Sequence, residues 1–403
     1  MPKIYANRGL SNSTTLQSTP QMTCPFGELR VVHRTPIIDL KSTFGISLLR
    51  DTVVQTSGGT VVGSTTTNTG EFMLSTTATV GSQAALQSNE RGSYQSGYGM
   101  EVGIGLRISV APPAGVVVKW GHFDTTNGYY YQWDSVNKLS CNVLKNSSVT
   151  QVIQSAFNID LLDGTGPSGI TLDMSRGMIF HITLSWYGYG AVIYSMIITD
   201  NVGNQQIVPI HQISVPFGTS TASPHQPVRV DMTNVSGNTV ASNVYVGGRQ
   251  MSIVGMLKPV SRITAVILQN KNYTSTVTYM IAFRKKAAYL GFKVLMSGVD
   301  IAVPNVTFSF INTMCTVTGG TWVAPTNTLS TETAIEVNSS FTGIAAVGTQ
   351  VFSALASPYA TVGAEFDAVA LTDNDIMVLS LQAVAGNGTQ TLNGLIVRLT
   401  ELW

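Results

Sequence analysis

The most conspicuous shortage in this 403-residue sequence is charge. Lys and Arg total 22 and Asp and Glu total 21, so the charged fraction is 11%, against roughly 25% in an ordinary soluble domain. Because disordered chains are rich in charge and poor in apolar residues, the hydrophobic fraction of 44% argues against a disordered chain. A net charge of +1 attracts phosphate backbones only weakly, so no specific nucleic-acid partner is expected.

Long hydrophobic runs are also missing. The apolar stretch from Tyr187 to Ile198 is interrupted by Gly188, Gly190 and Ser195, and a spanning helix needs about 20 apolar residues. We therefore expect no membrane span. A chain with so little charge must cover its surface with Ser, Thr, Asn and Gln or with other subunits, and the second possibility predicts a homo-oligomer.

Cysteines are few, and the common catalytic and metal-binding motifs are absent. Cys24, Cys141 and Cys315 are far apart and form no CxxC or Cys/His metal spacing. The sequence has no Walker A loop, no GxSxG and no HExxH. Gly103 and Gly105 precede strand-like residues and not a helix, which excludes a dinucleotide fingerprint. The sequence thus predicts neither a cofactor nor a metal.

Short runs of β-type residues separated by turn residues fill most of the chain. Met100–Ile108 alternates with period two, and Gly128–Trp133 is rich in aromatic residues. Phe180–Trp186 and Ala191–Ile198 flank a short glycine-containing turn, which predicts a hairpin. Val149–Phe157 fits a short helix as well as a strand. Many short strands of this kind predict an all-β fold of antiparallel sandwich or jelly-roll-like domains.

Changes in composition divide the chain into three parts. Residues 1–30 are polar and rich in Ser, Thr and Gln, and they have too little apolar surface to fold alone. They are interpreted as an extended N-terminal arm, either flexible or laid across a neighbour. Residues 31–255 are predicted to form a β-sandwich domain, and residues 256–403 a second β-rich domain.

One group of titratable residues could suggest hydrolytic chemistry. Asp160, Asp163 and Asp173 are clustered, and His181 follows them. A hydrolase needs a nucleophile with a base or a pair of carboxylates. Asp side chains also accept backbone N–H bonds in turns, which is the interpretation we favour here. A calcium site in this loop has no EF-hand spacing to support it. The chain is therefore predicted not to be an enzyme.

Two groups of charged residues are predicted to be solvated. Arg284-Lys285-Lys286 is the densest basic cluster and is interpreted as a strand end whose charges face water. Glu90 and Arg91 could pair with other groups to pin a loop, but solvated charges are the favoured interpretation.

The aromatic residues supply the candidate binding residues. A cluster of aromatic side chains is more often a packed β core than a sugar platform, yet surface loops that carry such residues can contact a ligand or a partner. The candidates for ligand or partner contact are Trp120, Tyr129, Tyr130, Trp133, Trp186 and Tyr189.

Several strings between residues 70 and 403 resemble a domain of structural proteins from tailed phages and large DNA viruses. They are Ala84–Tyr94, Trp120–Tyr129, Asn158–Gly169, Trp186–Gly190, Val246–Gln250, Phe283–Lys286 and Glu401–Trp403. The sequence thus resembles a largely uncharacterised group of β-rich virion structural proteins. The resemblance implies a location in the virion more than it implies a mechanism.

Two functions from different classes follow from these features. The first is a structural component of a virus particle, such as a capsid, penton, minor-capsid or fibre-associated protein. Such a protein would act through contacts with itself and with other virion proteins. The alternative is a host-attachment protein on the virion surface that binds a receptor or a glycan. A polysaccharide-degrading spike is a third and weaker hypothesis.

Overall fold

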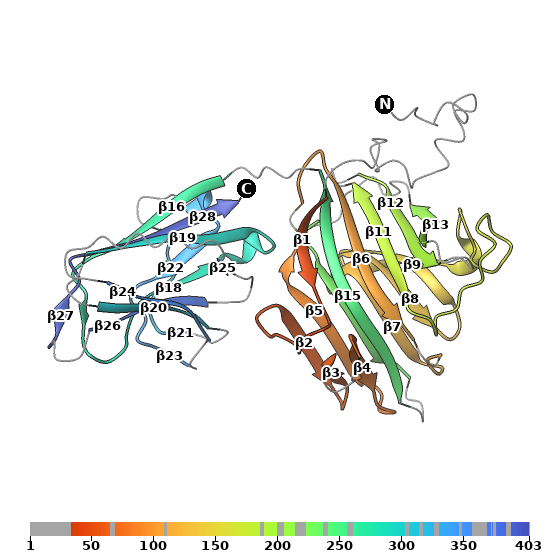
Figure 1. The fold of residues 1–403 in the computed structure, drawn as a ribbon, viewed down its shortest axis with the longest axis horizontal. Coiled ribbons are helices and arrows are strands. Elements are labelled where there is room, and N and C mark those ends of the chain that lie inside the picture. Colours follow the sequence, from red (N-terminus) through yellow and green to blue (C-terminus); the bar gives the residue numbers. More distant parts are fainter. Residues whose placement is uncertain are drawn as a thin grey trace. The chain divides into compact units, whose positions relative to one another are not determined.

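The computed structural model divides the chain into two compact units, Met1–Leu257 and Lys258–Trp403. The sequence predicts this boundary after residue 255. The structure describes residues 34–64, 69–92, 94–108, 111–185, 189–199, 205–213, 223–236, 241–255, 261–302, 306–313, 317–325, 330–345, 349–356, 369–371, 373, 376–383 and 388–402. The proposed N-terminal arm, residues 1–30, lies outside this part of the chain. Each unit is built almost entirely from β-strands (Figure 1).

The first unit contains an eight-stranded antiparallel sheet. Seven of its strands follow one another in the order β13 (Gln205–Ile213), β12 (Val192–Thr199), β11 (Met178–Ser185), β6 (Gly99–Arg107), β15 (Ser242–Val254), β4 (Phe72–Thr76) and β3 (Thr60–Val62). The eighth strand, β1 (Arg34–Leu40), also pairs with β15. The predicted hairpin is confirmed, since β11 and β12 pair with Phe180 opposite Met196.

A seven-stranded antiparallel sheet completes the first unit. Its order is β10 (Ser148–Ile153), β9 (Lys138–Lys145), β8 (Gly128–Asp134), β7 (Val116–Phe123), β14 (Pro227–Asn234), β5 (Gln83–Arg91) and β2 (Asp51–Thr56). In the ambiguous segment Val149–Phe157, the strand alternative holds for the part within β10, and a single 3-10 turn at Gln154–Ala156 follows it.

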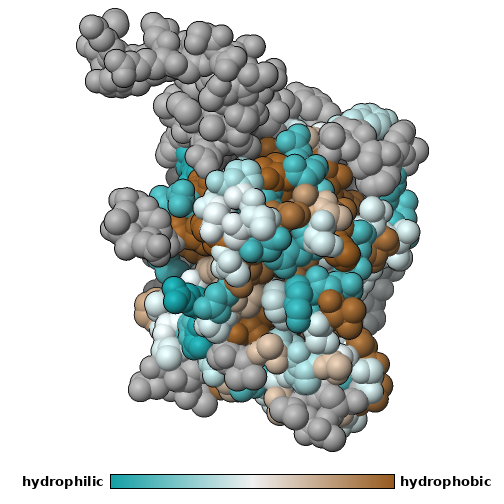
Figure 2. Space-filling model, turned by 90° about the vertical axis from the view of Figure 1, so that its right-hand side faces the viewer, coloured by the Kyte–Doolittle hydropathy of each residue, from teal (hydrophilic) through white to brown (hydrophobic). Residues whose placement is uncertain are grey.

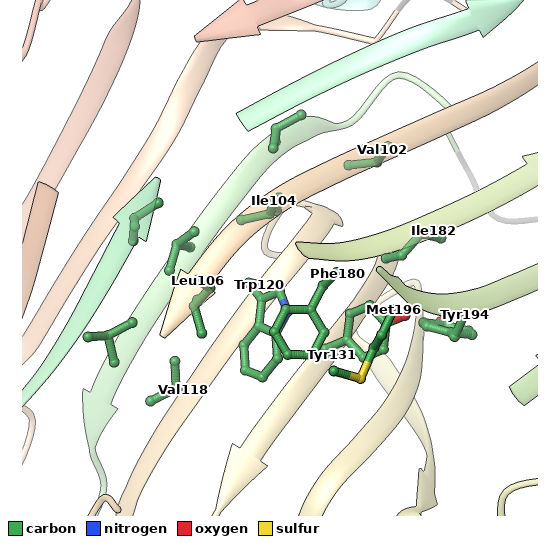
Figure 3. Close-up of a cluster of buried hydrophobic side chains, with 14 of the residues drawn as sticks. Val102, Ile104, Leu106, Val118, Trp120, Tyr131, Phe180, Ile182, Tyr194 and Met196 are labelled. Atoms are coloured by element: carbon green, nitrogen blue, oxygen red, sulfur yellow. The ribbon is translucent and has the colours of Figure 1, made fainter. Parts of the chain in front are cut away.

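One hydrophobic core lies between these two sheets (Figure 3). The Trp120 ring of β7 is stacked on Tyr131 of β8, with centroids 5.7 Å apart. From the opposite sheet, the Phe180 ring meets Trp120 edge-on at 4.7 Å. Fully burying a large apolar side chain contributes roughly 1.5–3 kcal/mol. The strands of both sheets turn one row of side chains each into this core. The predicted antiparallel sandwich is confirmed.

The second unit is also built from antiparallel sheets. A four-stranded sheet has the order β16 (Ser261–Leu268), β28 (Gly394–Leu402), β19 (Lys293–Ala302) and β25 (Val369–Leu371). A five-stranded sheet has the order β22 (Ile335–Asn338), β18 (Thr278–Lys285), β26 (Ile376–Ala383), β20 (Val306–Thr313) and β24 (Thr349–Ala356). Two small ribbons pair β17 (Asn272–Tyr273) with β27 (Gln390–Thr391) and β21 (Val317–Thr318) with β23 (Gly343–Ile344). A second core contains side chains from both larger sheets.

The prediction that the basic triplet of the second unit faces water is wrong for Lys285, which is buried, whereas Arg284 and Lys286 are partly exposed. Arg284 pairs with Glu336 at 2.8 Å. Lys285 is 5% exposed and pairs with the equally buried Asp373 at 2.5 Å. The Lys286 Nζ donates to a backbone carbonyl at 2.8 Å. A buried cation is stable only when it is paired, and the Asp373 carboxylate supplies that partner to Lys285.

None of the described helices is long and apolar enough to cross a membrane. On the side of the molecule shown in Figure 2, hydrophobic and hydrophilic residues are interspersed over the described surface. Such mixing is normal for a protein surface, where isolated apolar side chains need no special explanation.

Candidate functional site

A pocket opens on the outer face of the eight-stranded sheet, above strand β6. The inward side chains of β6, from Met100 to Leu106, are at most 2% exposed and belong to the core. The alternating outward positions include Gly103 and Gly105, which have no side chain to cover the sheet. The resulting pocket has a volume of about 420 Å³. It is lined by Arg34, Asp39, Leu40, Lys41, Gly103, Gly105, Ile179, His181, Ile197, Ile207, Gly248, Arg249 and Gln250.

One wall of the pocket is apolar, and the strand register explains why. Gly105 is opposite Ile179, Ile179 is opposite Ile197, and Ile197 is opposite Ile207. Residues opposite one another in antiparallel strands point to the same face. The three isoleucines therefore form a row that runs across three strands towards the glycine floor. Ile179 is 38% exposed, which leaves this wall open to a ligand.

The neighbouring row is polar. His181 is opposite Gly103, Gly103 is opposite Gln250, and Gln250 is opposite Asp39. The Gln250 Oε1 accepts a hydrogen bond from Ser252 Oγ at 2.6 Å, which fixes the orientation of the amide. A Cβ added to Gly103 would lie 3.2 Å from Gln250 Nε2, so the amide lies across the glycine.

Two groups on this row are available to a ligand. The Gln250 Nε2 has no acceptor among the described residues, and the exposed Asp39 carboxylate has no donor among them. The row therefore offers an oriented donor beside an acceptor. Lys41, also exposed, adds a cation to the same side of the pocket.

A buried carboxylate lies at one end of the polar row. Glu101 is only 1% exposed although it points outward from β6. Arg34 Nε lies 2.9 Å from its Oε2 atom, and His181 Nε2 lies 3.7 Å from the same atom. The His181 Nδ1 also contacts Thr183 Oγ1 at 3.3 Å. These contacts hold the imidazole in place at the end of the pocket.

An ion pair between the sheets lies on the inner side of the pocket. The register of β15 shifts between Val246 and Arg249, and the guanidinium of Arg249 turns into the sandwich. Its two terminal nitrogens bind the two Asp51 oxygens at 2.8 and 3.1 Å. Arg249 is fully buried. Sequence reasoning missed this pair; the only available signal was the Gly247-Gly248 doublet, which is typical of a bulge.

Three of the six predicted contact residues belong to the core of the first unit. Trp120 is fully buried, so its predicted role as a ligand contact is wrong. Tyr129 and Trp133 are partly buried and pack against the same core. All three lie on the inward-facing side of β7 and β8, because Val118 is opposite Trp133 and His122 is opposite Tyr129.

The other three predicted contact residues do not form a common site. Tyr130 points to the outer face of the seven-stranded sheet, where it packs on Phe123 at 4.8 Å and is only 1% exposed. Burial raises the pKa of Tyr130 to about 12. Tyr189 is 57% exposed, and Trp186 lies outside the described residues. The structure therefore does not bring the six aromatic residues together as one site.

The aspartates near the glycine-rich loop cap turns, as predicted. Asp160 accepts backbone N–H bonds from Leu162 and Ser168, both at 2.8 Å. Asp163 and Asp173 accept hydrogen bonds from Thr165 and Ser175, respectively. The fourth member of the predicted group, at position 181, lies on β11 and lines the pocket instead. Among the described residues, no group of three or more His, Cys, Asp or Glu could hold a metal ion.

Arg91 pins a loop, contrary to the favoured interpretation of solvated charges. Its Nη1 lies 3.1 Å from the Asp124 carboxylate, and both side chains are 19% exposed. The same nitrogen donates to the backbone oxygen of His225 at 3.1 Å. This pair connects the end of β5 to the turn between β7 and β8.

Comparison with known proteins gives similarity at the level of solved structures alone. No family model and no curated protein matches the sequence. The Emp47p carbohydrate recognition domain is 11% identical with a TM-score of 0.34, over 55% of this chain and 95% of that one. For the cellulose-induced protein Cip1, the identity is 14%, the TM-score 0.34 and the coverage 54% and 97%. A beta-1,3-glucanase from Mycobacterium marinum is 12% identical with a TM-score of 0.33, over 54% of this chain and 98% of that one. Values this low say nothing about the ligand or reaction of this chain.

Proposed function

We propose that the first unit is a non-catalytic glycan-binding module, and that the chain serves in host attachment on a virus particle. The observation that carries this proposal is the two-sided pocket, with isoleucines on one wall and oriented hydrogen-bonding groups on the other. The virion context is supported by the resemblance of the sequence to virion structural proteins, and it remains a prediction.

The chemistry of the two walls fits a saccharide. A sugar ring has an apolar C–H face and an edge of hydroxyl groups, so it can bury the first against Ile179 and Ile197 and present the second to Gln250 and Asp39. Opposite residues in antiparallel strands have Cβ atoms about 4.5–5.5 Å apart. An amide donor and a carboxylate acceptor at that spacing can bind neighbouring hydroxyl groups. The volume of about 420 Å³ is within the usual range for small-ligand sites.

Binding without cleavage is part of the proposal. Glycoside hydrolysis uses a pair of carboxyl groups that both reach the scissile bond. Of the two carboxylates beside this pocket, Glu101 is buried and engaged by Arg34, so only Asp39 is presented to a ligand. Chromatography of a bound oligosaccharide after long incubation should show no shorter products. Shorter products that disappear in Asp39→Ala or Glu101→Gln would contradict this part of the proposal.

The structural role through subunit contacts is the second candidate function. It is favoured by the low charge of the chain and by large apolar residues that the second unit exposes, such as Ile263 at 66% and Ile267 at 43%. Both functions can be present in one virion protein, because they use different units of the chain.

A glycan array tests the leading proposal. The intact chain should bind a defined set of glycans, and calorimetry with the best of them gives a dissociation constant. Asp39→Ala and Gln250→Ala should each weaken binding about tenfold, the effect expected from losing one good hydrogen bond. Gln206→Ala, at an exposed glutamine of β13 outside the pocket lining, is the matched control. The proposal fails if no glycan binds, or if binding survives both pocket substitutions unchanged.

A further inference from the structure

Strand β16 forms an open edge of the four-stranded sheet in the second unit. Within the described part of the chain it pairs with β28 alone. Its eight residues, Ser261–Leu268, run opposite β28 without a register shift and contain no proline or lysine. Natural proteins usually protect such edges with prolines, lysines, bulges or short strands. The backbone groups on the open side of β16 are therefore ready to pair with another strand.

The outer face of this edge is apolar. Thr264, Val266 and Leu268 point into the sandwich and are buried. The alternating residues face outward: Ile263 is 66% exposed, Ile267 is 43% exposed, and Ala265 between them is also exposed. On the neighbouring strand, Ile396 lies opposite Ile267 and is 36% exposed.

The charges near this edge are already paired within the unit. Arg262, the one charged residue of β16, contacts the backbone oxygen of Glu332 and lies 3.5 Å from its carboxylate. Arg398 of β28 binds Asp300 at 3.1 Å. The edge thus presents no unpaired charge of one sign, so an identical edge would meet it without repulsion.

We propose that β16 is a self-association surface whose occupant is the β16 strand of a second copy of this chain. An antiparallel pair centred on Ala265 places Ile263 opposite Ile267 of the second copy, and the reverse. The register is therefore self-complementary about a two-fold axis, as a symmetric dimer requires. Four strands from each copy become one continuous sheet, and the exposed isoleucines of both copies lie side by side. This inference is independent of the glycan-binding proposal.

Sedimentation equilibrium of the intact chain tests the surface. The unmodified protein should be a dimer at micromolar concentration, and Ile263→Lys/Ile267→Lys should be a monomer because the four lysines of two copies would repel one another. The control is Val149→Lys/Ile153→Lys on strand β10 of the first unit, where the replaced residues are 50% and 37% exposed. It adds the same charge to another edge strand and should leave the dimer intact. Circular dichroism verifies that each variant is folded.

A cysteine placed on the two-fold axis gives a second test, in which the proposed dimer is cross-linked and not broken. With Cys24 and Cys315 replaced by serine, Ala265→Cys should form a disulfide-linked dimer on mild oxidation, since opposite residues lie within disulfide distance. Ser275→Cys, at another exposed position of the second unit, should not. A monomeric wild type, a dimer that persists with both lysines, or equal cross-linking at the two positions would each overturn the proposal.

Discussion

On the outer face of the eight-stranded sheet, the central strand β6 presents Gly103 and Gly105, and a pocket lies above them. On the outer face of the seven-stranded sheet, the interior strand β14 presents Arg229 and Asp231 instead, and both are only 8% exposed. Their polar groups are used within the sheet, since Arg229 Nη1 donates to Gln87 Oε1 at 3.0 Å. The first face has room for a ligand, whereas the second is filled by its own side chains.

This difference shows how a β-sandwich can make a site without changing its framework. Glycine inside a strand weakens the strand but leaves room for another group to approach the backbone. Gly103 makes room for the Gln250 amide, and Gly105 forms the floor beside the isoleucine wall. The neighbouring strands β11 and β15 hold β6 on both sides, so the sheet tolerates the two missing side chains.

The largest expected effect is a loss of folding stability in the first unit, which carries both faces. Asp51→Ala leaves the guanidinium of Arg249 buried without its partner, which should destabilise the first unit by about 3–5 kcal/mol. Urea unfolding measures the loss. Asp163→Ala is the matched control, because this aspartate is exposed and its hydrogen bonds lie within one turn; its effect should be much smaller. Equal losses of unfolding free energy in the two variants would mean that the ion pair between the sheets stabilises the unit no more than a hydrogen-bonded surface turn does.

Acidification should destabilise the first unit through His122, which is buried on β7. Burial is the main cause that lowers the pKa of His122 from 6.5 to about 4. Between pH 6.5 and 4 the unfolded chain binds a proton at this residue that the folded chain does not, so stability falls as the pH falls. The full loss is about 3 kcal/mol.

Urea unfolding at pH 7 and at pH 4.5 checks this dependence, and His122→Gln should reduce it. Burial also lowers the pKa of His211, which adds a slope of the same sign that the variant retains. An unchanged pH dependence in His122→Gln would show that this histidine is not the source.

A smaller effect should be confined to the filled face. Arg229→Ala removes the hydrogen bonds to Gln87 and Asp231 and should cost about 2 kcal/mol, as for hydrogen bonds to charged groups. Glycan affinity should remain within about twofold of the wild type, since the pocket lies on the other sheet. A large loss of affinity without unfolding would place ligand contacts on the seven-stranded sheet.

The sequence predicts the strands of the first unit well but not its pocket. The period-two pattern of Met100–Ile108 identifies β6, and the aromatic run Gly128–Trp133 identifies β8. The alternation also predicts that Tyr130 points to the opposite face of the sheet from Tyr129 and Tyr131, but it does not say which of the two faces is the core. The polar wall depends on Asp39 lying opposite Gln250, a pairing between distant parts of the chain. Such a register is set by the packing of the whole sheet, so local patterns do not reveal it.

The most direct test compares one substitution on each face. A Cβ at Gly105 would lie 3.7 Å from its nearest neighbours, which is ordinary contact, so Gly105→Val should fold within about 1 kcal/mol of the wild type. It should weaken glycan binding more than about tenfold by filling the pocket floor. Ala85→Val on the filled face, where Ala85 is fully buried, should cost about 1–3 kcal/mol by overpacking and leave binding unchanged. Wild-type affinity in Gly105→Val, measured by calorimetry on the intact folded chain, would contradict the account.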